Sequence, residues 1–223
     1  MLLDEQIIPF LFNLEFPAPL PALFDVLHPF KDPETQRVCK QFYHEFYHDP
    51  LPRFAIVGIN PGRFGAGVTG VPFTDPIRLN DYCGINNNWP RKPELSSVFM
   101  YEMIEAFGGV KAFYSQFFIT AISPLGFVKS GKNINYYDNK ELQESVTPFA
   151  VDCMRTELQW HLKTEVAFCL GEGKNFKYFS KLNGEHHFFK TIIPLPHPRF
   201  IMQYKLKSKQ LYIDKYLSAF SSK

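Results

Sequence analysis

The sequence has few cysteines, and no two of them are spaced as a CxxC pair. The four are Cys39, Cys83, Cys153 and Cys169, of which Cys153 and Cys169 fall in helix-like and strand-like stretches. Zinc sites and iron–sulfur clusters draw on closely spaced cysteines, so this pattern favours reduced thiols in the core over a metal or cluster site.

The sequence also lacks a long apolar run and an excess of one charge. No stretch approaches the roughly 18 apolar residues of a membrane helix. Asp4, Glu5 and several prolines interrupt the N-terminus, which is not typical of a signal peptide, so we expect a cytoplasmic protein. The 24 basic and 22 acidic residues leave a net charge of +2, which neither requires nor excludes nucleic acid.

Apolar residues are abundant, at 45% of the 223 residues, which is enough for a sizeable core. We expect a single domain over residues 1–223. Aromatic residues make up 17%, including 24 phenylalanines, and this excess favours core packing over base stacking.

Short apolar runs alternate with helical patterns along the chain. The predicted strands are Arg53–Gly58, Gln116–Ala121, Glu165–Leu170 and His187–Leu195. The predicted helices are Pro33–Tyr47, Pro93–Phe107, Thr147–Lys163 with Pro148 in its first turn, Gly173–Leu182 and Tyr204–Phe220. This order predicts an α/β fold, a three-layer α/β/α sandwich around a mostly parallel four-stranded sheet, with ligands beyond the carboxyl ends of the strands.

The segment after the first strand, Gly58–Pro76, contains five glycines but neither GxGxxG nor GxxxxGK[ST]. It therefore does not carry either nucleotide-binding fingerprint. It places the amide of Asn60 at the strand end and Phe73 thirteen residues later. A purely structural Gly/Pro turn is the alternative interpretation.

Two further strand ends carry polar residues. In Pro194–Arg199, three prolines surround His197 and restrict the backbone, which is typical of a site that holds one imidazole in a fixed position. A histidine in an exposed proline turn is the alternative interpretation. The basic residues that follow could meet a phosphate backbone or form an ordinary surface helix. Ser123–Asn133 has small and hydroxyl residues typical of a ligand-facing loop or of a plain surface loop.

Together these motifs resemble the single-strand-selective monofunctional uracil-DNA glycosylases, a family of the uracil-DNA glycosylase superfamily. GINPGRFG…TGVPF, from Gly58 to Phe73, resembles the family's first motif, and His197-Pro198-Arg199 resembles its second. Pro124-Leu125 and Ser130-Gly131-Lys132-Asn133 resemble segments between them. The order agrees from about Arg53 to Phe220 and is most similar to a divergent, bacterial-type branch.

The resemblance implies a uracil-DNA glycosylase-like fold and a monofunctional DNA glycosylase that excises uracil, with xanthine and hypoxanthine left open as further substrates. Asn60 would position water, His197 would donate to the base oxygen, and Phe73 would stack on the extruded base. The remaining implied base-binding positions are Ile59, Pro61, Gly62, Ala121 and Ser123. The implied DNA-binding positions are Gly65, Ser130, Lys132, Arg199 and Phe200, the last two at the family's duplex wedge.

The sequence departs from the family at two places. Ala121 stands where the family has an asparagine that reads the base edge, so Ser123 substitutes for it or selectivity is loose. The second motif is also shortened, which leaves the wedge assignment open. No cofactor or metal is expected, and the expected partner is DNA containing uracil or other deaminated bases, bound by a monomer associated with the bacterial nucleoid.

Two other functions remain open from the sequence. One is a DNA- or base-binding module of the same fold without turnover, which Ala121 favours and the presence of Asn60 and His197 disfavours. The other is a small-molecule hydrolase or nucleotide-binding α/β protein, which the absence of a nucleophile elbow and a P-loop disfavours.

Overall fold

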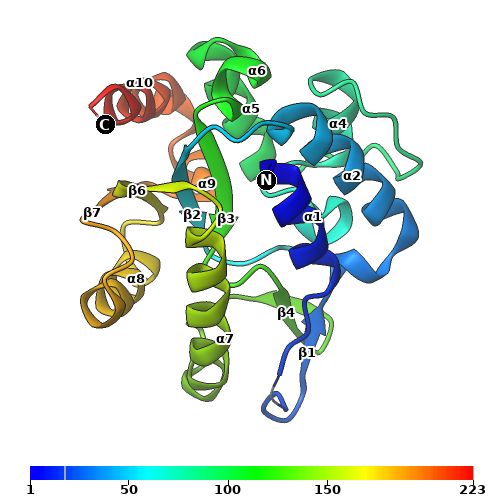
Figure 1. Ribbon diagram of the computed structural model, residues 1–223, viewed down its shortest axis with the longest axis vertical. Helices are drawn as coiled ribbons and strands as arrows, with labels where there is room; N and C mark the ends of the chain where they lie inside the picture. Colours follow the sequence, from blue (N-terminus) through cyan, green and yellow to red (C-terminus); the bar gives the residue numbers. More distant parts are fainter. Residues whose placement is uncertain (18, 223) are drawn as a thin grey trace.

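The computed structural model describes residues 1–17 and 19–222 and contains two β-sheets, a central one flanked by helices and a smaller one at the lower edge of the view in Figure 1. The strands are β1 (Phe24–Leu27), β2 (Arg53–Gly58), β3 (Phe117–Ala121), β4 (Gly126–Lys129), β5 (Lys132–Ile134), β6 (Leu162–Leu170) and β7 (Thr191–Leu195). The α-helices are α1 (Leu3–Phe12), α2 (Pro33–Tyr47), α3 (Ala66–Thr69), α4 (Pro76–Asp81), α5 (Leu95–Phe107), α6 (Gly109–Tyr114), α7 (Lys140–Leu158), α8 (Lys174–His186), α9 (Pro198–Tyr204) and α10 (Lys209–Ser221). Two 3₁₀ turns, η1 (Pro29–Lys31) and η2 (Leu206–Ser208), complete the set.

The central sheet has the strand order β3-β2-β6-β7, and all its neighbouring pairs are parallel. Gly58 pairs with Ala121, and Leu170 pairs with Leu195, so the carboxyl ends of the four strands lie at one edge. The predicted four-stranded parallel sheet is confirmed, and the segments that follow its strands meet where ligands bind in such folds.

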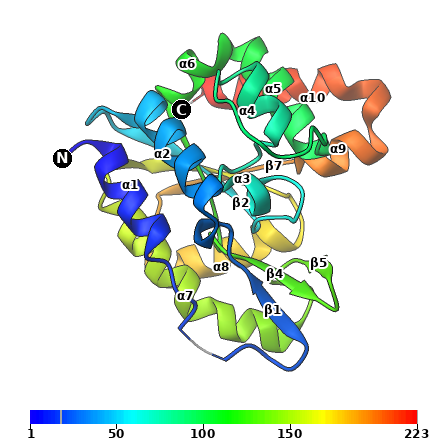
Figure 2. The ribbon, with the colours of Figure 1, turned by 90° about the vertical axis from the view of Figure 1, so that its right-hand side faces the viewer.

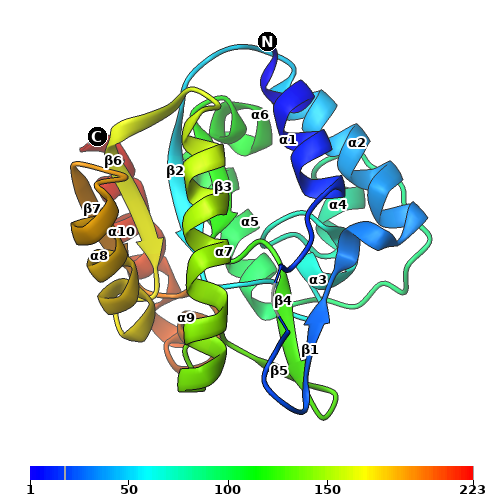
Figure 3. The same cartoon turned by 60° about the horizontal axis from the view of Figure 1, so that its bottom comes forward.

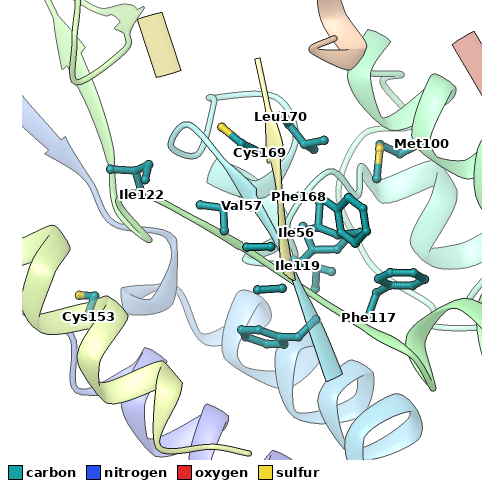
Figure 4. Close-up of a cluster of buried hydrophobic side chains, with 14 of the residues drawn as sticks. Ile56, Val57, Met100, Phe117, Ile119, Ile122, Cys153, Phe168, Cys169 and Leu170 are labelled. Atoms are coloured by element: carbon teal, nitrogen blue, oxygen red, sulfur yellow. The ribbon is translucent and has the colours of Figure 1, made fainter. Parts of the chain in front are cut away.

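Helices cover both faces of this sheet, as predicted (Figure 2). Phe117 points toward α5 and α10, where its ring lies 4.5 Å from that of Phe220. The next residue, Phe118, points the other way and its ring lies 5.7 Å from that of Tyr47 on α2. Figure 4 shows the resulting core, with Met100 of α5 and Cys153 of α7 on opposite sides of the strands.

A second sheet was not predicted. Strands β1, β4 and β5 form an antiparallel sheet beside the carboxyl edge of the central one (Figure 3). Ser130 and Gly131, with φ angles of 49° and 71°, make the tight turn between β4 and β5. The strands have only three or four residues each, too few for a clear alternation in the sequence.

The helix predicted to begin at Thr147 begins seven residues earlier. Asn139 caps α7 by accepting a hydrogen bond from the Leu142 N–H at 2.9 Å, and Pro148 lies inside the helix. The hydroxyl of Thr147 donates to the Gln143 carbonyl at 2.7 Å. Pro148 removes one intrahelical bond, but burial of the apolar face of α7 on both sides of it maintains the helix.

The end of the chain also differs from the prediction. The helix expected over Tyr204–Phe220 begins at Lys209 as α10, after the 3₁₀ turn η2, and the preceding helix α9 was not predicted. Helix α9 begins directly after His197, whose side chain caps it. Helix α1 was not predicted either.

The four cysteines are free thiols, with Cys39, Cys153 and Cys169 buried and Cys83 partly exposed. Among the described residues, no helix is long and apolar enough to cross a membrane.

Candidate active site

A cavity of about 720 Å³ opens at the carboxyl edge of the central sheet. Its wall includes residues that follow three of the strands, namely Asn60 after β2, Gly171 after β6 and His197 after β7. At its mouth, Phe64 and Phe200 are each 43% exposed and Tyr204 is 71% exposed. The volume lies in the range of about 300–1,000 Å³ that is typical of small-molecule sites.

The side chain of Asn60 is held in one orientation. Its Oδ1 accepts a hydrogen bond from the Tyr136 N–H at 3.1 Å, and its Nδ2 donates to the carbonyls of Pro61 and Ile134, each at 3.3 Å. Both amide hydrogens are therefore engaged, and the remaining polar capacity is a lone pair on Oδ1. Asn60 can offer an acceptor to a water molecule or a hydroxyl group.

Tyr136 and Asn175, which the sequence analysis did not identify, hold Asn60 in position. Tyr136 is fully buried, and its hydroxyl donates to Oδ1 of Asn175 at 2.7 Å. Asn175 lies in the first turn of α8, and its Nδ2 donates to the carbonyls of Leu170 at 3.0 Å and Gly58 at 3.4 Å. The chain Asn60–Tyr136–Asn175 thus connects the amide to the ends of β2 and β6.

His197 has a defined tautomer. Its Nδ1 accepts a hydrogen bond from the Arg199 N–H at 3.1 Å, so the neutral ring carries its proton on Nε2. Burial, and then the nearby Arg199 guanidinium, lower the pKa of His197 to about 4. The ring is therefore neutral at physiological pH and still presents an N–H donor.

Phe73 reaches the same cavity through an unusual backbone conformation. Its φ angle of 52° lies in the left-handed region, which is uncommon for a phenylalanine and marks local strain. The ring passes over Gly58, where an added Cβ would lie 3.0 Å from Cε2 of Phe73, and its centroid lies 5.8 Å from that of His197. Glycine at position 58 makes this close approach possible.

The predicted base-binding residues do not all reach the cavity. Ile59, Pro61, Gly62 and Ala121 line it, and Ala121 lies on the strand face of Gly58 because the two are paired in parallel register. Ser123 does not line it, since its side chain is fully buried and donates to the Leu125 carbonyl at 2.7 Å. This hydroxyl is not placed to replace the missing asparagine amide.

The predicted DNA-binding residues fall into two groups around the mouth. Gly65, Arg199 and Phe200 line the cavity, the last two in the first turn of α9. Ser130 and Lys132 are exposed at the β4–β5 turn and do not line it. The Arg63 guanidinium donates to the Gly131 carbonyl, and the Arg63 N–H donates to Oδ1 of Asn133 at 3.1 Å, so this turn is attached to the loop after β2.

One buried acidic side chain lines the cavity from the α7 side of the sheet. Glu157 of α7 is 2% exposed and accepts a hydrogen bond from the Thr120 hydroxyl at 2.8 Å. Burial raises the pKa of Glu157 to about 8, so it is protonated at neutral pH. Thr120 and Ala121 alternate across the sheet, so Glu157 lies behind the strands, away from Gly58 and Ala121.

Comparison with known proteins identifies the family of the chain. Residues 45–221 match the family model of the uracil DNA glycosylase superfamily. The crystal structure of wild-type Pedobacter heparinus SMUG2 is similar at 47% sequence identity with a TM-score of 0.97, covering 100% of this chain and 98% of that one. No curated protein matches the chain. The chain therefore belongs to the uracil-DNA glycosylase superfamily, in a family of the SMUG type, and is a hydrolase of N-glycosidic bonds that acts on uracil in DNA.

Proposed function

We propose that this cavity excises uracil from DNA by using Asn60 and His197 on opposite parts of an extruded nucleotide, and that it admits other deaminated bases such as xanthine and hypoxanthine. The observation that carries the proposal is the pairing of an oriented acceptor, Asn60 Oδ1, with a neutral donor, His197 Nε2–H, around a stacking surface at Phe73. In this arrangement, the donor stabilises the leaving base and the acceptor orients water.

Asn60 positions the attacking water molecule. Cleavage of the N-glycosidic bond leaves an oxocarbenium-like sugar, which a water molecule captures. An amide is too weak a base to remove a proton before bond cleavage, so Asn60 holds the water by accepting one of its hydrogens. The barrier is therefore lowered mainly through the departing base.

His197 stabilises the departing nucleobase. The departing base gains negative charge on its ring oxygen, and the Nε2–H of His197 donates to that oxygen while the ring remains neutral. The main-chain N–H groups of Ile59 and Phe73 bind the other oxygen. Phe73 stacks on the base, which is extruded from the strand at a cost of a few kcal/mol.

Ala121 accounts for broad base selection. It lines the cavity on the same face as Gly58 and offers no hydrogen bond to the base edge, and Ser123 is engaged elsewhere. Because position 121 carries no hydrogen-bonding group, nothing there is mismatched to the edge of a purine base. Gly62 also lines the cavity without a side chain, and an added Cβ there would lie 3.0 Å from Nδ2 of Asn133.

The mouth of the cavity contacts the DNA strand. Arg199 and Phe200 on α9 meet the nucleotides beside the extruded one, and the Phe200 ring is tilted against that of Tyr204 at 5.6 Å between ring centroids. Phe64 also lines the cavity, and the Lys92 ammonium and the Arg63 guanidinium lie over its ring at 4.4 Å and 5.2 Å from the centroid. Gly65, Ser130 and Lys132 approach the phosphates, and the enzyme binds its DNA, including that of a nucleoid, as a monomer.

The test is single-turnover excision of uracil from an oligonucleotide, read by alkaline strand cleavage. We expect Asn60→Ala and His197→Ala each to raise the barrier by about 2–4 kcal/mol, a rate loss of about 30- to 1,000-fold. The matched control is Asn88→Ala, since Asn88 is exposed and lies outside the cavity.

Two outcomes would contradict the proposal. Wild-type rates in both variants would show that the site is assigned wrongly. Tight binding of uracil-containing DNA by the wild-type protein without any cleavage would instead identify a binding module. Parallel substrates carrying xanthine and hypoxanthine test the breadth of base selection.

A further inference from the structure

A group of three potential metal ligands lies on the surface where α1 packs against α2, outside the cavity. Asp4 lies in the first turn of α1. His44 lies in the last turn of α2, and His48 follows one helical turn later as its C-cap residue. Residues four apart on a helix project from the same face, so both imidazoles reach the same neighbour.

That neighbour is a single carboxylate oxygen. Nδ1 of His44 lies 3.2 Å and Nδ1 of His48 lies 3.0 Å from Oδ2 of Asp4. The two rings lie 4.2 Å apart between centroids. Oδ1, the other oxygen of Asp4, accepts the Glu5 N–H at 3.0 Å.

In the part of the chain that the structure describes, no lysine or arginine forms an ion pair with the buried carboxylate of Asp4. Its side chain is 6% exposed, and among the described residues its ion-pair partners are these two histidines. The nearby cations are engaged elsewhere, Arg53 with Asp49 and Lys111 with Glu45. A bound cation would complement the charge of this buried carboxylate.

We propose that Asp4, His44 and His48 bind a zinc ion that fastens α1 to α2. Two imidazole nitrogens and one carboxylate oxygen are a ligand set that zinc favours and magnesium does not. In a tetrahedral site with bonds of about 2.0–2.1 Å, ligand atoms lie about 3.3 Å apart. The two measured separations are within a few tenths of an ångström of that value, and all three ligand atoms lie within 4.8 Å of one another, so rotation of the imidazoles brings them around an ion.

Zinc binding defines the tautomer of both histidines. The lone pair of each Nδ1 must face the ion, so each bound histidine carries its ring proton on Nε2. A water molecule completes the four ligands. The ion does not take part in catalysis, because these residues do not line the cavity.

The experiment uses the full chain without a histidine tag, freed of metal by chelation and then titrated with zinc chloride. We expect one zinc ion per chain by calorimetry. At zinc concentrations about 100 times the dissociation constant, Tm should rise by roughly 5–10 °C, and magnesium at the same concentration should leave it unchanged.

Three variants make the test specific. His44→Ala truncates a side chain that is 66% exposed, so it removes a ligand with little loss of packing. Both His44→Ala and Asp4→Asn should lose at least tenfold in zinc affinity and most of the rise in Tm. His187→Asn, at an exposed histidine outside the group, should bind zinc as the wild type does.

An unchanged zinc affinity in His44→Ala and Asp4→Asn would overturn the proposal, as would the absence of a zinc-dependent rise in Tm in the wild type. Uracil excision by the chelated wild-type enzyme, assayed well below its Tm, should equal that of the zinc-loaded enzyme. A requirement for zinc in excision would contradict the structural role.

Discussion

Removing the hydroxyl of Tyr136 tests whether the buried chain behind Asn60 controls catalysis. The substitution Tyr136→Phe keeps the fully buried ring and deletes the hydrogen bond of 2.7 Å to Asn175. Oδ1 of Asn175 then loses its partner in a buried place, which costs about 1–3 kcal/mol of stability. The more informative effect is on Asn60, whose Oδ1 is held by the main-chain N–H of the same Tyr136.

A small shift of Asn60 is enough to misplace the attacking water. Misplacement by a fraction of an ångström to 1 Å lowers rates by up to about 100-fold, so we expect a loss of about 3- to 30-fold in single-turnover excision. The assay uses saturating enzyme on a uracil-containing oligonucleotide, with DNA affinity by fluorescence anisotropy and Tm measured on the same samples. DNA affinity should change little, because Tyr136 is buried.

The matched control is Tyr178→Phe. Tyr178 packs against Tyr136 at 4.8 Å between ring centroids, but its hydroxyl bonds to Thr147 and not to the chain behind Asn60. The decisive comparison combines Tyr136→Phe with Asn60→Ala. If Tyr136 acts through Asn60, the double variant is no slower than Asn60→Ala alone. A further slowing in the double variant, or a wild-type rate in Tyr136→Phe, would refute the reasoning.

Two further predictions concern base selection and pH. Ala121→Asn should raise uracil excision relative to xanthine and hypoxanthine by up to about tenfold, the equivalent of one good hydrogen bond, whereas an unchanged ratio together with a lower Tm would show that the position is only structural. Because the pKa of His197 is lowered to about 4, its contribution to excision should be constant from about pH 5 to pH 8 and fall only as pH approaches 4. The folded state favours the neutral ring, so the stability that His197 contributes is fully present above its unfolded pKa of about 6.5 and is lost as pH falls toward 4. A loss of excision centred near pH 6.5, absent in His197→Gln, would contradict the lowered pKa.

Some of the candidate site could be predicted because its residues follow strands directly. Asn60 and His197 stand next to apolar runs, and parallel strands end at one edge, so their meeting follows from the order of elements. Phe73 was predictable only from the resemblance, since its reach depends on a left-handed backbone and on the absence of a side chain at Gly58. The role that the resemblance implied for Ser123 does not fit the structure, because its hydroxyl is hydrogen-bonded within its own loop.

The predicted helix boundaries were wrong where a local sequence signal competed with tertiary packing. Thr147 and Pro148 form a typical helix start, yet Asn139 starts α7 and the buried face of the helix carries it through Pro148. Near the C-terminus, the helix predicted from Tyr204 begins only at Lys209, because the 3₁₀ turn η2 precedes α10.

The sequence by itself determined the alternation of strands and helices, the parallel sheet and the two polar side chains at its carboxyl edge, because periodicity and chain order are local properties. Only the tertiary structure decided which groups hold those side chains. Tyr136 lies 76 residues from Asn60, and Asp4 lies 40 and 44 residues from His44 and His48. Contacts of this kind depend on how helices pack and how a short hairpin folds back, and no pattern within a single segment records them.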